Sequence, residues 1–341
     1  MKCIPTKEAV GHVLCHDLTR IVPGVTKDAA FRKGHVVTEE DIPPLLSMGK
    51  DRLYVWEKTE GMLHENEGAD RLLALCRNEH MMSTPVKEGK IELKANCTGL
   101  FRVDVDRLMA VNSVGELMIA TRHTNTVVRP GDKLAGMRVI PLVIEEKKLE
   151  EAEQAAGTEP LLELLPFARK TAAIVTTGNE VFYDRIQDQF TPVLVKKLAD
   201  LGVEVVFHTK CPDDRQEIVS AIGAARESGA ELVLCTGGMS VDPDDQTPGA
   251  IKAAGAQVVA YGAPVLPGAM FLLGYFGDGT PVMGLPGCVM YAKATIFDLI
   301  LPRVLANVPV SKADLARLGH GGLCLGCAEC RYPICPFGKE E

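Results

Sequence analysis

Residues that could bind an anionic ligand are concentrated between Thr236 and Pro248, in a segment that reads TGGMSVDPDDQTP. Thr236 is followed by two glycines, then Ser240 and three carboxylates, and Thr247-Pro248 is typical of a helix start. Glycine lets the backbone approach a ligand, and the N–H groups of a helix start attract anions. Mg²⁺ prefers carboxylate and phosphate oxygens. The segment therefore predicts a phosphate site with Mg²⁺, and the alternative is an exposed acidic loop before a helix.

Two further glycine turns follow predicted strands. The first, Thr176-Thr177-Gly178-Asn179-Glu180, offers hydroxyl and N–H groups that can hold phosphate, and the second is Gly284-Leu285-Pro286-Gly287-Cys288. Either turn alone is also typical of an ordinary connection between elements. Their positions after predicted strands are more informative than their sequences, because ligands of open α/β sheets bind beyond the carboxyl ends of the strands. We therefore expect all three segments to meet at one edge of a sheet.

Other catalytic motifs have little support. The chain has no GxGxxG after a strand and no GxxxxGK[ST], which disfavours a dinucleotide oxidoreductase and a P-loop protein. His12, Cys15 and His16 lie close in sequence, but proximity in sequence does not create the geometry of a Cys/His nucleophile.

Residues 307–341 are expected to form a Cys-rich metal-binding tail. Cys324, Cys327, Cys330 and Cys335 follow the spacing C-x₂-C-x₂-C-x₄-C in a Gly-rich segment. Four thiolates in such a segment can converge on one ion or cluster. Zn²⁺ and a [4Fe–4S] cluster both suit this spacing, an unstructured reactive tail is the alternative, and His320 is a weaker additional candidate.

The elements that position these residues are predicted from apolar strands that alternate with amphipathic helices between residues 171 and 306. The predicted strands cover residues 172–178, 203–209, 231–238, 256–262 and 280–287. Continuous apolar strands separated by helices are typical of a mostly parallel sheet with helices on both faces. The expected fold class is therefore α/β, preceded by smaller β-rich domains and followed by the short Cys-rich tail.

The remainder of the chain is expected to divide into smaller parts. Residues 1–60 predict a small α+β module with a strand at residues 53–56. Residues 61–146 predict a β-rich domain whose short strands suggest a partly closed barrel. Residues 147–170 combine Glu/Lys helix formers with Gly157 and Pro160, which predicts a linker.

Composition restricts the classes of partner. A chain of 341 residues suits two or three domains, and a net charge of −8 argues against nucleic acid. The N-terminal residues predict no signal peptide, and the most apolar helical candidate, residues 289–301, is too short to span a membrane. We therefore expect a cytoplasmic protein without a membrane partner, whose eleven cysteines are thiols or metal ligands.

The three glycine segments, in this order and spacing, resemble the shared domain of molybdenum cofactor biosynthesis proteins, which include molybdopterin adenylyltransferases and molybdopterin molybdenumtransferases. The likeness covers about residues 171–306. Asp245-x-Thr247-Pro248 is similar to the adenylyltransferase branch. Leu266-Pro267-Gly268 and the Gly-Leu-Pro-Gly turn are similar to the molybdenumtransferase branch, and Asp188 looks like the family's second functional aspartate.

This resemblance implies a pterin ligand, molybdopterin or its adenylate, with Mg²⁺. It also implies a homo-oligomer and a client molybdoenzyme as a partner. Asp245, together with Asp188 and Glu180, is then expected to place Mg²⁺ or molybdate as the catalytic group. The residues expected to contact the ligand are Thr176, Thr177, Gly178, Thr236, Gly237, Gly238, Ser240, Asp242, Thr247, Pro286 and Gly287.

Several positions depart from the family pattern. Ala269 stands where the molybdenumtransferases usually have a basic residue, and Cys288 and Phe190 stand where they usually have asparagine. Asp244 replaces the arginine of the adenylyltransferases and makes the loop similar to that of competence-damage proteins. Loss of cations weakens anion binding unless Mg²⁺ compensates. The expected function is that of a molybdopterin-binding protein of molybdenum cofactor biosynthesis, and transfer of molybdate to molybdopterin or its adenylate is the reaction that the resemblance implies. The alternatives are a non-catalytic carrier, sensor or insertion partner and, with less support, a nucleotide pyrophosphatase similar to competence-damage proteins.

Overall fold

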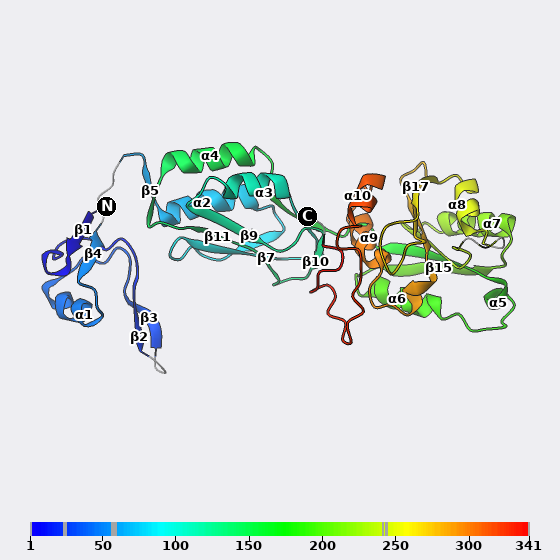
Figure 1. Ribbon diagram of the computed structural model, residues 1–341, viewed down its shortest axis with the longest axis horizontal. Coiled ribbons are helices and arrows are strands. Elements are labelled where there is room, and N and C mark those ends of the chain that lie inside the picture. The colour runs from blue at the N-terminus through cyan, green and yellow to red at the C-terminus, as the bar shows by residue number, and fades with distance from the viewer. Residues whose placement is uncertain (1, 23–25, 56–59, 241, 243–244, 340–341) are drawn as a thin grey trace. The chain divides into compact units, whose positions relative to one another are not determined.

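The computed structural model describes residues 2–22, 26–55, 60–240, 242 and 245–339 (Figure 1). The chain folds into two compact units. The first consists of Met1–Asn96, Val103–Arg122 and Gly131–Glu163, and the second of Cys97–Arg102, His123–Pro130 and Leu164–Glu341. The chain therefore passes between the units at five points, after residues 96, 102, 122, 130 and 163.

A six-stranded sheet forms the centre of the second unit. Its strands are β14 (Thr171–Thr177), β15 (Glu204–Cys211), β16 (Val233–Thr236), β17 (Gln257–Tyr261), β18 (Leu272–Tyr275) and β19 (Pro281–Leu285), in the order β15-β14-β16-β19-β18-β17. The pairs β15–β14, β14–β16 and β16–β19 are parallel, whereas β18 runs antiparallel to both of its neighbours. The prediction of a mostly parallel sheet is confirmed, and the antiparallel strand β18 is the one that the sequence pattern missed.

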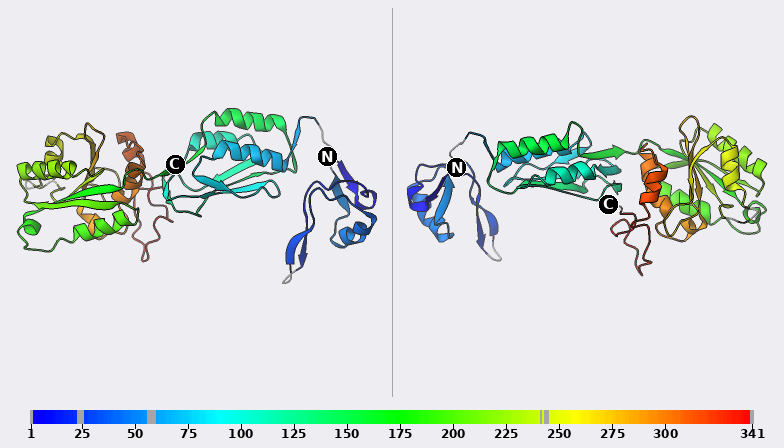
Figure 2. Two further views of the ribbon diagram at one scale, coloured as in Figure 1. Left: turned by 180° about the vertical axis from the view of Figure 1, so that it is seen from behind. Right: turned by 45° about the horizontal axis from the view of Figure 1, so that its top comes forward.

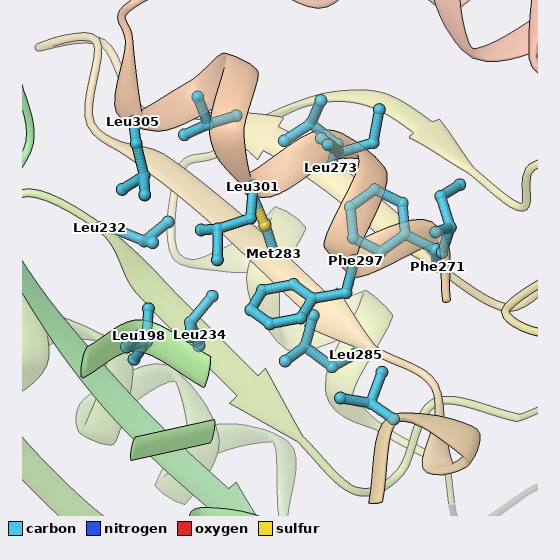
Figure 3. Packing of buried hydrophobic residues seen from close by; sticks show 14 of the residues in the cluster. Leu198, Leu232, Leu234, Phe271, Leu273, Met283, Leu285, Phe297, Leu301 and Leu305 are labelled. Atoms are coloured by element: carbon cyan, nitrogen blue, oxygen red, sulfur yellow. The ribbon is translucent and has the colours of Figure 1, made fainter. Parts of the chain in front are cut away.

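Helices cover both faces of this sheet (Figure 2). Successive strand residues point to opposite faces, so each strand contributes side chains to two cores. Ile174 and Leu234 face a core that includes residues of α6 and α9, part of which is shown in Figure 3. Val175 and Cys235, one position further along, face a second core with α7 and α8. The helices of this unit are α5 (Asn179–Phe182), α6 (Phe190–Ala199), α7 (Arg215–Glu227), α8 (Thr247–Ala253), α9 (Ile296–Leu305) and α10 (Lys312–Arg317), and η3 (Gly287–Met290) is a short 3₁₀ turn.

The carboxyl ends of three neighbouring parallel strands lie at one edge of the sheet. β14 ends at Thr177, β16 at Thr236 and β19 at Leu285. The register pairs Thr176 with Thr236, and Thr236 with Leu285. The three glycine turns of the sequence therefore leave the sheet beside one another.

The C-terminal segment is anchored to the second unit at its base. The backbone N–H of Leu266 donates to the carbonyl oxygen of Gly322 at 2.8 Å, and that of Cys324 donates to the carbonyl oxygen of Leu266 at 2.8 Å. Phe337 is buried in the same core as α9. Leu266 lies two residues before Gly268, so these hydrogen bonds attach the tail to the connection between β17 and β18, which leads to the sheet edge.

A small three-stranded sheet completes the second unit. Its order is β10 (Thr126–Val128), β8 (Gly99–Val103) and β13 (Leu162–Pro166). Leu100 of β8 is fully buried in the core that contains α6 and α9. Two short excursions of the chain, residues 97–102 and 123–130, are thus part of this unit.

The main part of the first unit is an antiparallel sheet in the order β6-β7-β11-β9, covered by three helices. It is an open sheet and not the partly closed barrel that we expected. Helix α4 buries Leu149, Ala152 and Ala156, and it supplies the first part of the segment 147–170. The elements are β5 (Met62–His64), α2 (Glu65–Cys76), β6 (Met81–Ser83), β7 (Lys90–Ala95), α3 (Val105–Asn112), β9 (Leu117–Thr121), β11 (Lys133–Val139), β12 (Val143–Glu145) and α4 (Glu146–Ala156).

The N-terminal residues form a small module with its own core, in which Leu14, Leu45 and Leu53 are buried. The predicted strand at residues 53–56 corresponds to β4, although Trp56 lies outside the described residues. Among the described residues, no helix has both the length and the apolar character needed to cross a membrane. The elements of the module are β1 (Lys2–Pro5), η1 (Thr6–Glu8), β2 (Leu18–Val22), β3 (Thr26–Phe31), η2 (Glu39–Asp41), α1 (Ile42–Ser47) and β4 (Arg52–Val55).

Candidate functional site

A cavity of about 900 Å³ lies at the carboxyl edge of the six-stranded sheet. The ends of β14, β16 and β19 contribute to its wall, as do residues 186–190 and the connection 268–270. Of the residues expected from the sequence, those that line the cavity are Thr176, Thr177, Glu180, Asp188, Thr236, Gly237, Gly238, Ser240, Asp242, Asp245, Pro286 and Gly287. Gly178 and Thr247 stand behind this lining.

The buried residues Thr177 and Thr236 line the cavity, and Thr247, which is not part of the lining, contacts Thr177. The hydroxyl oxygens of Thr177 and Thr247 are 3.1 Å apart, so the end of β14 is tied to α8. Thr236 is only 1% exposed, and within the described part of the chain its hydroxyl has no hydrogen-bond partner. A buried hydroxyl that lacks a hydrogen bond costs about 1–3 kcal/mol. A ligand that accepts a hydrogen bond from Thr236 would remove this cost.

The two glycines after β16 are required by the space around them. Gly237 and Gly238 have φ values of +84° and +55°, a region that other residues rarely adopt. A Cβ atom at position 237 would collide with the carbonyl oxygen of Thr177, and one at position 238 would lie 2.8 Å from the hydroxyl oxygen of Thr247. Only glycine fits at both positions, and both glycines line the cavity.

The charged groups of the cavity wall are all acidic among the described residues. Glu180, Asp188, Asp242 and Asp245 line the wall, and no lysine, arginine or histidine does. The N–H of Asp242 donates to a carboxylate oxygen of Asp245 at 3.2 Å, so these two residues form one tight turn. Asp244 lies outside the described residues. An anionic ligand would therefore need a cation that the wall itself does not supply.

Asp188 also caps a helix. Its Oδ1 accepts hydrogen bonds from the N–H groups of Phe190 (2.8 Å) and Thr191 (3.0 Å), and its Oδ2 accepts one from the Thr191 hydroxyl at 2.6 Å. Burial raises the pKa of Asp188, but the bonds from Thr191 and Phe190 lower it by more, so the net pKa lies below its usual value. The carboxylate is thus ionised and held at the start of α6.

Two polar residues of the site were not predicted from the sequence. His208, on β15, places its Nε2 atom 3.1 Å from the hydroxyl oxygen of Thr176. Tyr261, on β17, donates to the carbonyl oxygens of Met239 (2.9 Å) and Ser240 (3.1 Å) and so holds the loop after β16. Both residues stand on strands that the sequence did predict, but only the strand register shows which side chains reach the site.

The tail cysteines are not gathered into a metal-ligand group. Cys327 and Cys330 are exposed, Cys324 and Cys335 are half-buried, and all four are free thiols. The described residues contain no group of three or more His, Cys, Asp or Glu side chains arranged to hold a metal ion. Zn²⁺ or a [4Fe–4S] cluster at these positions therefore stays a prediction.

The fold and the cavity define an α/β domain with a ligand site at its glycine-rich strand ends. This domain matches a known family. Residues 173–306 match the family described as "Probable molybdopterin binding domain", and this part of the chain is a domain of that family. The matched residues include the whole described cavity wall. Residues 3–57 match a family described as a domain of unknown function.

Curated relatives match only a short part of the chain. A "CinA-like protein" of Mycobacterium tuberculosis is 37% identical over 76 residues, which are 22% of this chain and 18% of that protein. A "CinA-like protein" of Mycolicibacterium vanbaalenii is 38% identical over 76 residues, again 22% and 18%. The chain thus spans less than a fifth of the length of these relatives.

Solved structures are similar to the chain over a larger segment at low identity. The CinA protein of Thermoplasma acidophilum has a TM-score of 0.35 and 20% identity, and the match covers 40% of this chain and 98% of that one. The tungsten cofactor synthesizing protein MoaB of Pyrococcus furiosus has a TM-score of 0.35 and 21% identity, with 41% and 96% covered.

Proposed function

We propose that the cavity of the second unit binds molybdopterin or its adenylate and that the protein acts in molybdenum cofactor biosynthesis. The end of β16 carries this proposal. There, Thr236 has a buried hydroxyl without a partner among the described residues, and Gly237 and Gly238 line the cavity. The match of residues 173–306 to a molybdopterin-binding family supports the choice of ligand.

The acidic wall suggests how the ligand's negative charge is balanced. Asp245, Asp242 and Glu180 are the carboxylates that would hold Mg²⁺, which neutralises phosphate charge when it is bound. The hydroxyl of Thr236 and the N–H groups of the glycine turn would orient the phosphate. In this proposal Asp188 contributes by fixing the start of α6 against the cavity.

The finer step that we propose is transfer of molybdate to the bound pterin. Positioning and charge neutralisation are the two contributions that this site can make to such a reaction. The alternative with the same ligand is a carrier that binds the pterin without reacting it. Because the described wall residues include no basic side chain, Mg²⁺ would have to be the cationic partner of the departing and incoming anions, and without a bound cation only the carrier function is left.

Binding and transfer are separated by one set of variants. The protein is purified anaerobically, bound pterin is released and oxidised to its fluorescent form, and the pterin-free protein is titrated with molybdopterin in the presence and absence of Mg²⁺. We expect Mg²⁺-dependent binding, at least tenfold weaker in Asp245→Asn because a charged ligand of the cation is lost. Asp200→Asn, at an exposed pair with Lys196, is the matched control and should bind as the wild type does.

The outcomes divide the hypotheses. If the wild type binds no pterin, the proposed ligand is wrong. If Asp245→Asn binds the pterin and supports cofactor assembly as well as the wild type, the transferase step is wrong and the carrier is retained.

A second candidate function is a nucleotide pyrophosphatase. The 37% identity with a CinA-like protein over 76 residues favours it. Mg²⁺-dependent hydrolysis of the pyrophosphate bond of ADP-ribose, measured as release of AMP and ribose 5-phosphate, tests this function directly. A lack of cleavage by protein that binds the pterin would exclude it.

A further inference from the structure

A cluster of four side chains stands directly behind the cavity wall. The hydroxyl oxygens of Thr176 and Thr191 are 3.2 Å apart, and His208 Nε2 lies 3.1 Å from the first and 3.2 Å from the second. Asp188 completes the cluster through its 2.6 Å bond with the hydroxyl of Thr191. Thr176 and Asp188 both line the cavity. Thr176 is the one whose side chain lies within hydrogen-bonding distance of the imidazole, whereas Asp188 Oδ2 lies 3.8 Å from Nε2 and 3.5 Å from the Thr176 hydroxyl oxygen.

The hydrogens available to this cluster can be assigned one by one. An ionised carboxylate only accepts, so the short contact between Thr191 and Asp188 uses the Thr191 hydrogen. The Thr176 hydrogen then has two directions, toward the cluster or toward the cavity. Burial lowers the pKa of His208, more than the charge of Asp188 raises it, so the imidazole is neutral at pH 7 and carries one ring hydrogen.

The position of that ring hydrogen decides the direction of the Thr176 hydroxyl. If Nε2 is bare, Thr176 donates to it, and the cavity meets only the lone pairs of the hydroxyl oxygen. If Nε2 carries the hydrogen, the imidazole donates into the cluster. The Thr176 hydrogen then has only the 3.5 Å contact with Asp188 and the oxygen of Thr191 as alternatives within the cluster, and a phosphate oxygen in the cavity can take it. Phosphate oxygens only accept hydrogen bonds, so an anionic ligand is compatible with the second arrangement and is repelled by the first.

We propose that His208 is a positioning residue of the ligand site, which in the liganded protein carries its ring hydrogen on Nε2 and thereby makes Thr176 a donor to the ligand's phosphate. This inference rests on the proposed function, because it requires an anionic group at the cavity wall beside Thr176. It adds a residue that does not line the cavity and that acts only through a neighbouring hydroxyl.

The tautomer is observed directly by NMR of protein labelled with ¹⁵N-histidine, before and after saturation with molybdopterin, at pH 7. We expect the ¹⁵N shifts of His208 in the complex to be those of a protonated Nε2 and a bare Nδ1. His320→Asn is a control that changes a histidine of the exposed tail and should leave the His208 signals unchanged. A complex with a bare Nε2 would overturn the inference and leave the proposed ligand intact.

A double-mutant cycle tests whether His208 acts through Thr176. His208→Gln retains an amide that can donate near the place of Nε2, and we expect its affinity for molybdopterin to stay within about twofold of the wild type. His208→Leu leaves the Thr176 hydrogen to bond with Thr191, and we expect a loss of about tenfold, which corresponds to one hydrogen bond to a charged group. In a Thr176→Val background the same His208→Leu change should have no further effect.

The cycle separates positioning from a general effect on folding. Thermal unfolding of each variant checks that the sheet is intact. A loss on His208→Leu that is equally large with Thr176→Val would overturn the inference, since the imidazole would then act by another route. Wild-type protein that binds no molybdopterin would overturn the proposed function, and this inference with it.

Discussion

The hydroxyl oxygen of Thr177 at the end of β14 lies 3.1 Å from the hydroxyl oxygen of Thr247 in the first turn of α8. These residues are seventy positions apart in the chain. Both are almost fully buried, so each hydroxyl depends on the other for its hydrogen bond. This contact fixes the loop between β16 and α8. The loop enters α8 at one end, and at the other end Gly237 and Gly238 lie close to Thr177.

Thr247→Val should therefore destabilise the protein by about 1–3 kcal/mol, since it leaves the hydroxyl of Thr177 buried without its partner. Urea unfolding, followed by circular dichroism, measures the change. Ser220→Ala, which removes an exposed hydroxyl bonded to its own helix, should shift the free energy of unfolding by less than about 0.5 kcal/mol. Equal effects of the two changes would contradict the importance of the Thr177–Thr247 contact.

Gly238→Ala should weaken ligand binding and stability together. The new Cβ atom would lie 2.8 Å from the Thr247 hydroxyl oxygen, at a φ of +55° that alanine adopts only at a cost of about 1–2 kcal/mol. Gly223→Ala is the matched control. It stands in the middle of α7 with no heavy atom within 4 Å of the new Cβ, so it should stabilise the protein by about 0.5–1 kcal/mol. Thermal unfolding and pterin titration of both variants give the comparison, and an unimpaired Gly238→Ala would contradict the close packing at the strand end.

Asp188→Ala should cost about 0.5–2 kcal/mol of stability at pH 7, because it removes the cap of α6. The folded protein lowers the pKa of Asp188, so the carboxylate stabilises the fold fully above the unfolded value of about 3.9. This stabilisation is lost as the pH falls through the lower, folded pKa. The difference between wild type and variant in the free energy of unfolding should therefore shrink toward zero as the pH falls below the folded pKa. A difference of the same size at pH 7 and at the acid end would show that the negative charge is not what stabilises the helix.

If its four cysteines are ligands, the tail should bind one soft metal ion or one iron–sulfur cluster per chain. Metal analysis after anaerobic purification and the thiolate-to-metal absorption of the Co²⁺ form measure this binding, and a broad visible absorption of the untreated protein would indicate an iron–sulfur cluster. Cys327→Ser with Cys330→Ser should abolish the signal, because two exposed ligands are lost. Cys3→Ser, another exposed thiol, should not change it. If the wild type holds no metal and Zn²⁺ does not protect the tail thiols from alkylation, the prediction is wrong.

The fold of the second unit could be predicted because its signals are local. Apolar runs that end in glycine, such as the one before Gly237, define both the strand and the edge at which it ends. β18 was missed because Leu272–Tyr275 is a four-residue strand within an apolar segment, where length and periodicity carry little information.

The residues of the candidate site were likewise predicted only in part. The residues on the three glycine turns were predicted, because parallel strands bring their carboxyl ends together whatever the intervening sequence. His208 and Tyr261 were not, since they reach the site from neighbouring strands and depend on a register that sequence patterns do not give. The capping role of Asp188 was not predicted either, because it depends on α6 beginning at Phe190.

Because the second unit is built from three stretches of chain, proteolytic cleavage between them should disturb its folding. A protease that cleaved after residue 163 would separate most of this unit from residues 97–102 and 123–130, which also belong to it. The C-terminal fragment would then lack Leu100, which is fully buried in the core with α6 and α9. A fragment that begins at residue 164 should therefore be less soluble than the intact chain and should recover when a peptide containing residues 97–130 is added back.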